Sequence, residues 1–373
     1  MPAVIQADQL DSIIKTTERH IERDRKASIA ERLTEYIGAR MLFQEKKVIV
    51  SDGYGIEWNM TTDHSNTATQ VGLFDTIAPA TNLHQVRFNM PWRHTRAHVS
   101  WDLRELAMNK SPSRILNIVK EKIFEMDVAW IEQLESQIWQ GPTAGDDQSV
   151  FGLWGYWIYS PLDGGTNNNS GSYASTSTGA RVAVNRTGFS AGPGNVSRAT
   201  YSRSAPWYQN YTAVTYGDLF TKMRTGFNKI NYKAPVKANL LGDGNTKFGI
   251  YCTQADELLA ADQARLQNEN IGSDMAYYDG KAVVRGTPIT GVPKLDEIDA
   301  TLASANHPFL VIDWSQFRPI CLEGFAPYEV TETGGSNQPL TVTRARYMTW
   351  NARCWNAKTM ALFTQNTTTG ALP

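Results

Sequence analysis

Two histidines, His94 and His98, have the four-residue spacing with which a helix presents two ligands to a metal ion. They lie in a segment where apolar and polar residues alternate as in a β-strand, so residues 94, 96 and 98 share one face. Arg96 then stands between the two imidazoles, and its positive charge opposes a cation at that place. We therefore interpret these side chains as solvated or interface residues and predict no metal site.

Two glycine-containing stretches have part of the spacing of a nucleotide-binding motif. Residues 286–291 begin like a phosphate-binding loop, but Val292 and Pro293 occupy the positions of the required Lys and Ser or Thr. Residues 242–244, Gly-Asp-Gly, predict a turn and lack the full dinucleotide-binding pattern. The G-x-S-x-G spacing of serine hydrolases occurs at residues 188–192, but it lies inside a Gly- and Ser-rich stretch and not between a predicted strand and a predicted helix, which the nucleophile elbow requires. The sequence thus gives no support to a nucleotide cofactor or a serine nucleophile.

Carboxylates at Glu121, Glu125 and Asp127 lie within one predicted helix, where a pair could act as general acid and base. The same spacing is typical of a solvated helix face, and nothing singles out one pair. The cysteines match neither a disulfide framework nor a zinc pattern, and we interpret them as buried free thiols. They are Cys252, Cys321 and Cys354. We predict no catalytic residue, no cofactor and no enzymatic activity.

The composition is that of a globular protein, since 41% of the 373 residues are hydrophobic and 20% are charged. The formal net charge is -1. Binding to many phosphates requires a surplus of Lys and Arg, so tight nucleic-acid binding is disfavoured. No run approaches the roughly 20 apolar residues of a membrane span, and residues 1–10 lack the features of a secretory signal. The 11 tryptophans favour large aromatic contacts, in a core or between subunits.

A long strand excursion is predicted in the first third of the chain. Residues 47–60 and 86–101 alternate like strands on either side of a polar tip, 61–82. At Pro91 the apolar face changes phase, which predicts a bulge or bend. Because the excursion is too extended to bury itself, we expect it to contact other subunits.

One very long amphipathic helix follows the excursion. Ser111 and Pro112 provide a cap and a first helical residue, and the Gly-Pro pair at 141–142 stops the helix, which predicts a helix over 113–139. Apolar residues recur along it at steps of three and four, which defines the face that packs on the body. The main positions of this face are Leu116, Ile123, Trp130 and Leu134.

The flanking segments complete the predicted order of elements. Residues 6–36 predict a helical arm with a narrow apolar stripe that ends near Gly38, and residues 18–26 are almost entirely polar. Residues 141–215 are poor in charge and rich in Gly, Ser, Asn and Thr around the pair Trp154 and Trp157, which is typical of an insertion of loops and short strands. Helices are expected over 216–230 and 254–268, and strands over 238–241, 309–312 and 340–350.

This order resembles the major capsid proteins of tailed phages, the Hong Kong 97 fold. The resemblance is carried by the loop entry GYGIEWNM, the return HQVRFNMPWRHTRAHVSWDLRELAMN, and the helix SPSRILNIVKEKIFEMDVAWIEQLESQIW with the QGP that follows it. The later segments DLFTKMRTGFNKI, GIYCTQADELLAADQARLQ, VVRGTPITGVPKL and FLVIDWSQFRPI look like the helices and strands of the family's axial domain. The pattern is topological and has no single diagnostic motif.

The resemblance implies an α+β Hong Kong 97-like capsid fold in five parts. These are an N-terminal arm (1–46), an extended loop (47–98), a peripheral domain (99–204) with the spine helix and the Gly-, Asn- and Trp-rich insertion, an axial domain (205–325), and strands returning to the peripheral domain (326–373). Residues 141–215 are longer than the resemblance would lead us to expect. A scaffolding domain before the arm is not recognisable either.

The resemblance also implies a function, which we state as an expectation. The protein would be a major capsid protein that forms hexamers and pentamers of an icosahedral shell around double-stranded DNA. It would be located in the virion capsid, assemble in the host cytoplasm without a membrane, and contact the DNA only loosely. Portal and scaffolding or decoration proteins would be its partners. The side chains expected at intersubunit contacts are Trp58, His64, Arg87, Trp92, Arg93, Arg96, Glu18 and Arg23.

Three other functions stay open on the sequence alone. An encapsulin-like nanocompartment shell shares the same fold but usually lacks an insertion such as residues 141–215. An α+β hydrolase would need a catalytic pair that the sequence does not reveal. A β-rich adhesin or carbohydrate-binding protein would fit the Asn-, Ser- and Trp-rich middle, but it conflicts with the helix over 113–139.

Overall fold

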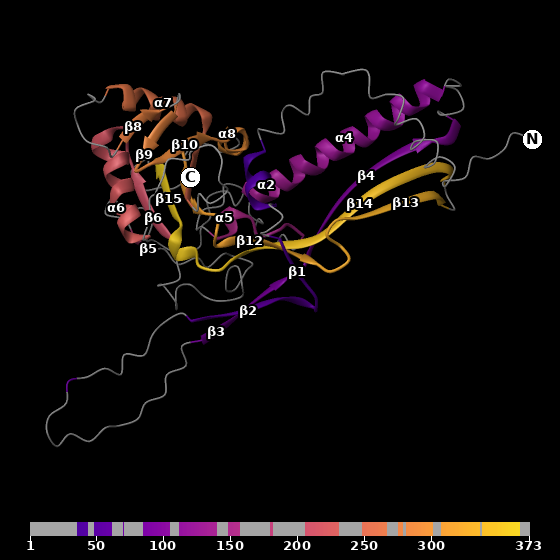
Figure 1. Ribbon diagram of the computed structural model, residues 1–373, viewed down its shortest axis with the longest axis horizontal. Helices are drawn as coiled ribbons and strands as arrows, with labels where there is room; N and C mark the ends of the chain where they lie inside the picture. The colour runs from indigo at the N-terminus through magenta and orange to yellow at the C-terminus, as the bar shows by residue number, and fades with distance from the viewer. Residues whose placement is uncertain are drawn as a thin grey trace, which may run out of the picture.

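The computed structural model describes residues 36–43, 48–61, 70, 85–104, 112–139, 148–156, 180–181, 206–230, 248–266, 275–278, 281–300, 307–335 and 338–365. Within them the chain forms two lobes, each built on a sheet, and a hairpin that points away from both (Figure 1). The predicted segments 6–35, 238–241 and most of 141–215 lie outside the described residues.

The first lobe contains an eight-stranded mixed sheet. Its strands, in spatial order, are β5 (Ala180–Arg181), β6 (Trp207–Tyr211), β15 (Ala361–Gln365), β11 (Phe309–Asp313), β7 (Phe248–Cys252), β10 (Thr287–Gly291), β9 (Lys281–Val284) and β8 (Met275–Tyr278). The helices beside it are a π-helix (Tyr216–Phe220), α6 (Thr221–Lys229), α7 (Gln254–Leu266) and α8 (Pro293–Ala300). All five residues of β11 are buried, as expected for a strand in the middle of a covered sheet.

The second lobe is elongated and contains a five-stranded sheet beneath one long helix. Its strands are β1 (Ile49–Ser51), β12 (Phe317–Leu322), β13 (Tyr328–Gly335), β14 (Gln338–Cys354) and β4 (Arg93–Asp102). The 17-residue β14 pairs with β4 along one edge and with β12 and β13 along the other. Helix α4 (Pro112–Trp139), 28 residues long, runs along this sheet and so has a length of about 42 Å.

Smaller elements join the two lobes. The hairpin consists of β2 (Gly55–Thr61) and β3 (Gln85–Pro91), which pair in register from Gly55 opposite Pro91 to Thr61 opposite Gln85. Three short helices pack near it: α2 (Ile37–Leu42), α5 (Leu153–Tyr156) and a 3₁₀ turn (Ala357–Thr359). The largest core collects buried residues from the hairpin, the C-terminal half of α4 and both sheets.

The chain divides between these parts differently from the predicted boundaries. The loop expected over 47–98 is divided between two sheets at Trp92. Before this residue β3 pairs with β2, and from Arg93 onward β4 pairs with β14. The predicted phase change near Pro91 corresponds to this passage between two sheets. The return strands expected over 326–373 also belong to two sheets. Strands β13 and β14 lie in the five-stranded sheet, whereas the apolar β15 pairs with β11 and β6 inside the eight-stranded sheet. Burial on both faces explains this position, since four of its five residues are buried.

Gly38 does not end a helix as predicted, because it lies inside α2. A Cβ atom at this position would stand 2.7 Å from Nε1 of Trp139 and 3.1 Å from the carboxylate of Glu135. The glycine therefore permits a close approach between α2 and α4. The sequence pattern of a helix-ending glycine is the same as that of a contact glycine, which explains the error.

Candidate functional site

The base of the hairpin packs on its own subunit. Trp58 and Phe88 stack with ring centroids 5.1 Å apart, and both are buried together with Ile56 and Met90. Trp58 is 6% exposed, so its indole contacts the body of the same chain. Only one face of the paired hairpin is buried in this way, and the alternate residues of β2 and β3, among them Glu57 and Arg87, are exposed.

Trp92 and Arg93 also make contacts within the subunit. The indole N–H of Trp92 donates a 2.8 Å hydrogen bond to the carbonyl oxygen of Gly53 and so holds the turn before β2. Arg93 is 7% exposed and its guanidinium lies 6.0 Å from the ring centre of Phe151. Alternation restarts at Arg93, so the odd-numbered residues of β4 face inward while His94, Arg96 and His98 are exposed.

Arg87 and Arg96 are the two expected contact residues that the structure places on the surface. Arg87 forms an ion pair with Glu57 across the hairpin. Arg96 is among the residues of β4 that, with residues of α4, line a groove of about 460 Å³; His94 and His98 line it too. The described residues contain no group of three or more side chains that could hold a metal. Glu18, Arg23 and His64 lie outside the described residues.

The spine helix packs largely as predicted. Trp130 and Leu134 are buried, and Ile123 is half-buried against the cluster formed by Trp101, Val119 and Val342. Leu116 lies within α4, but its side chain is outside the described part of the chain.

A buried carboxylate joins α4 to α2. Glu135 is 1% exposed and accepts hydrogen bonds from the backbone N–H groups of Gly38 (2.9 Å) and Ala39 (2.6 Å) and from Nε1 of Trp139 (2.5 Å). The first turn of a helix leaves such N–H groups without helical partners. A negative charge there is also attracted by the positive end of the helix dipole. Burial nevertheless raises the pKa of Glu135 above its ordinary value, because the ionised form loses hydration.

Two arginines on β14 are paired inside the subunit. Arg344 and Arg346 both bond the carboxylate of Glu329 on β13, and Arg346 also reaches Asp127 of α4 at 2.7 Å. These bonds hold the pKa of Glu329 below its usual range, with the hydrogen bond from Arg344 as the largest cause. The network links the spine helix to the sheet, and both arginines form their ion pairs within their own chain.

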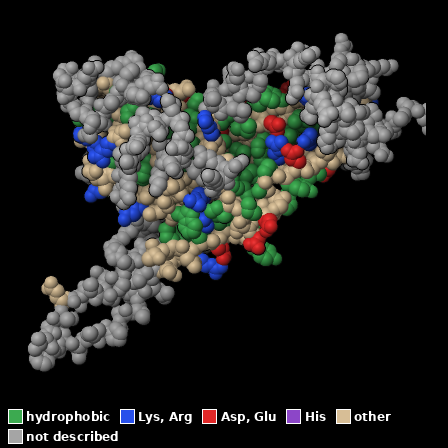
Figure 2. Space-filling model, viewed as in Figure 1, with side chains coloured by type: hydrophobic (Ala, Val, Ile, Leu, Met, Phe, Trp, Pro, Cys, Tyr) green, Lys and Arg blue, Asp and Glu red, His purple; other side chains and the backbone are tan. Residues whose placement is uncertain are grey.

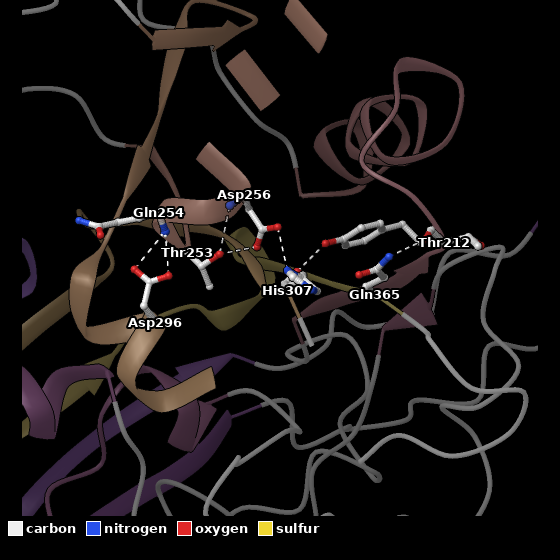
Figure 3. Close-up of polar contacts among 8 residues, drawn as sticks. Thr212, Thr253, Gln254, Asp256, Asp296, His307 and Gln365 are labelled. Atoms are coloured by element: carbon white, nitrogen blue, oxygen red, sulfur yellow. Dashed lines mark hydrogen bonds and ion pairs between the residues drawn. The ribbon is translucent and has the colours of Figure 1, made fainter. Parts of the chain in front are cut away.

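A buried Thr-Asp-His cluster in the first lobe tests the hydrolase alternative (Figure 3). Asp256 is fully buried, accepts a 2.6 Å bond from the Thr253 hydroxyl, and lies 2.9 Å from Nδ1 of His307. In a nucleophilic triad the hydroxyl faces the imidazole, whereas here the carboxylate stands between the two. Thr253 also accepts from the backbone N–H of Asp256, so the pair caps the start of α7. The cluster is a helix cap that Tyr211 extends by donating to the His307 carbonyl oxygen.

Several large apolar side chains reach the surface near the hairpin and β12. They are Val50, Tyr54, Phe325, Tyr328 and Trp355, exposed between 37% and 107%. Figure 2 shows hydrophobic side chains in separate patches among charged ones on one face. Sequence reasoning did not identify this group, although the run Glu-Gly-Phe-Ala-Pro-Tyr at 323–328 has the Gly and Pro of an exposed turn.

Solved capsid structures share this fold. The Cyanophage A-1(L) capsid asymmetric unit matches with a TM-score of 0.54 and 12% identity, over 85% of this chain and 89% of that one. The capsid of the empty GTA particle matches with a TM-score of 0.50 and 8% identity, over 95% and 98%. The holo-SrpI encapsulin complex from Synechococcus elongatus matches with a TM-score of 0.47 and 8% identity, over 94% of both chains.

The predicted α+β Hong Kong 97-like capsid fold is confirmed by the first two likenesses. No protein-family model and no curated protein sequence matches the chain. Within the described residues, no helix has both the length and the apolar character needed to cross a membrane.

Proposed function

We propose that this chain is a major capsid protein that self-assembles into the icosahedral shell around the double-stranded DNA genome of a tailed phage. The observation that carries the proposal is the structural likeness of 85% of this chain to a chain of the Cyanophage A-1(L) capsid asymmetric unit. In this proposal the first lobe is the axial domain, and the second lobe with α4 is the peripheral domain. Hexamers and pentamers form from identical copies, because closed symmetry multiplies modest contacts into a stable particle.

The arrangement of the hairpin supports this proposal. Its paired base is anchored in the subunit core, while residues 62–84 connect Thr61 and Gln85 at the far end. An anchored loop of this length can supply contact area to a neighbour without enlarging the core. Portal, scaffolding or decoration proteins complete the assembly in the host cytoplasm, and the near-neutral chain contacts the packaged DNA only loosely.

Assembly of the purified protein tests the proposal directly. Nuclease-treated protein is examined by sedimentation and negative-stain microscopy over a range of concentrations. Capsomers, sheets or hollow shells are the expected result. A monomer at every concentration would contradict the proposal, and shells from the native host that hold a cargo protein instead of DNA would identify a nanocompartment.

A loop deletion tests the role of the hairpin. Because Thr61 and Gln85 are opposite each other in the antiparallel pair, residues 62–84 can be replaced by a two-residue Asn-Gly turn. We expect this deletion variant to have the melting temperature of the full chain but to assemble poorly. Normal shells from a well-folded deletion variant would remove the loop from the assembly contacts.

A further inference from the structure

Two arginines that have no carboxylate partner among the described residues face each other on the five-stranded sheet. Arg318 of β12 and Arg353 of β14 are directly opposite in the antiparallel register, where like charges destabilise a sheet. Arg353 is 7% exposed and Arg318 is half-buried. In both guanidinium groups Nε is buried and has no hydrogen-bond partner. Within the described part of the chain, neither arginine forms an ion pair.

Aromatic rings hold one of these guanidinium groups in place. The Arg353 guanidinium lies 3.7 Å from the ring centre of Trp355 and 5.6 Å from that of Trp58. Stacking of this kind uses the flat face of the guanidinium and leaves its edge, which carries the N–H donors, for a planar anion. Trp355 is 37% exposed, so the site reaches the surface. Burial lowers the pKa of Arg353 to about 10, and the charge of Arg318 acts in the same direction while Tyr156 acts against it.

We propose that Arg318 and Arg353 form a receptor for a carboxylate supplied by a second copy of this chain. Guanidinium groups match a carboxylate geometrically, because each can donate two parallel hydrogen bonds to it. Burial of two cations without a paired anion costs free energy in the isolated subunit, and a carboxylate from a neighbour would offset that cost. The inference rests on the proposed function, since it assigns one intersubunit contact within the shell.

Charge balance favours a second copy over nucleic acid. The chain carries 36 basic and 37 acidic residues, so cations left unpaired inside one subunit are matched by acids left unpaired elsewhere on it. The exposed acids without an ion pair among the described residues are Asp52, Glu121, Glu125, Glu132, Glu323 and Glu332. A site for polyphosphate would instead require a basic surface over several phosphates.

We assign the carboxylate to Glu323. It begins the exposed segment 323–328, in which Phe325 and Tyr328 are 42% and 48% exposed with ring centroids 5.4 Å apart. An acid beside two exposed aromatic rings complements two arginines beside the exposed Trp355, because ion pairing and apolar contact can form together.

Arg318→Gln is the informative variant, because Arg318 makes none of the ring contacts that hold Arg353. Removing one of two opposed cations leaves the melting temperature of the unassembled subunit unchanged or raises it. The same change weakens assembly at least about tenfold in critical concentration, since it breaks a buried intersubunit charge pair. Arg40→Gln, which removes an exposed charge from α2, is the matched control and assembles like wild type.

The partner acid is tested by a double-mutant cycle. Glu323→Gln reproduces the defect, Glu332→Gln does not, and the Arg318→Gln/Glu323→Gln double variant is no worse than either single variant. Additive defects, normal assembly of Arg318→Gln, or a lower melting temperature of Arg318→Gln would overturn the inference. The inference would also be overturned if wild-type assembly required DNA and the Arg318→Gln variant lost only its DNA binding. Failure of the wild type itself to assemble would instead contradict the proposed function.

Discussion

The buried Glu135 offers the sharpest test of how the spine helix is anchored. Its carboxylate is the partner of three N–H groups, two from the first turn of α2 and one from Trp139 of the same helix α4. Glu135→Ala removes every acceptor at once and leaves these donors in a site where the glutamate was 1% exposed. Glu135→Gln keeps one oxygen, which still serves Gly38 and Trp139, and turns an amide donor toward Ala39.

The magnitudes of the two substitutions differ for this reason. Each buried donor left without a partner costs about 1–3 kcal/mol. With three such donors we expect Glu135→Ala to lower the free energy of unfolding by at least about 3 kcal/mol, a large part of a typical domain stability of roughly 5–15 kcal/mol. Glu135→Gln loses one bond but also avoids the burial of a charge, so it stays within about 1 kcal/mol of wild type at neutral pH.

The pH dependence has a definite sign. Burial raises the pKa of Glu135, so the folded state binds this proton more tightly than the unfolded state. The resulting stabilisation is complete below the unfolded pKa and is lost as the pH rises through the higher folded pKa. Wild type therefore gains stability over Glu135→Gln as the solution is acidified through this window.

Urea unfolding of the unassembled subunit, followed by circular dichroism at several pH values, measures these differences. Glu132→Ala is the control, because Glu132 is exposed on the same helix and accepts only the Tyr36 hydroxyl among described bonds. We expect it to change stability by less than about 0.5 kcal/mol. A Glu135→Ala variant as stable as this control would refute the anchoring role, and a wild-type advantage that shrinks in acid would refute the pKa direction.

Two further substitutions test the packing and the ion pairs of the second lobe. Trp130→Asp places a charge at a site that is 5% exposed and should leave the subunit unfolded, whereas Phe124→Asp, at a 37% exposed site on the same helix, should fold. Circular dichroism distinguishes them, and a folded Trp130→Asp would show that the helix register is wrong. Glu329→Gln should cost about 1 kcal/mol at neutral pH through its pairing with Arg344. Because the folded pKa of Glu329 is lowered, this difference disappears in urea titrations as the pH falls through that pKa; Glu332→Gln, unpaired on the same strand, should show no such change.

The elements with the longest periodic patterns were predictable from the sequence. Helix α4 was expected over 113–139 and spans Pro112–Trp139, because seven turns of apolar spacing and clear end signals agree. The strand expected over 309–312 is the buried β11, and the one over 340–350 lies within β14. In each case local pattern and tertiary burial favour the same structure, so no outside information was required.

The contacts of the hairpin could not be predicted in the same way. Alternation in β2 shows that Trp58 lies on an apolar face, but it does not say whether that face meets its own body or a neighbour. The structure places it against Phe88 and Arg353 of the same chain. Likewise, the pairing of Arg318 with Arg353 depends on the register of two strands that are distant in sequence. No spacing rule connects such residues.

The anchored hairpin base changes where assembly energy is expected to reside. If the whole excursion lay on neighbours, substitutions anywhere along it would weaken the shell and spare the subunit. With Trp58 and Met90 in the subunit core, substitutions at the base lower the stability of the subunit itself. Assembly-specific effects are then confined to the loop beyond Thr61 and to exposed groups such as Trp355 and Glu323. A subunit built this way can fold before it meets a partner, and its intersubunit contacts can stay individually weak enough to be corrected during assembly.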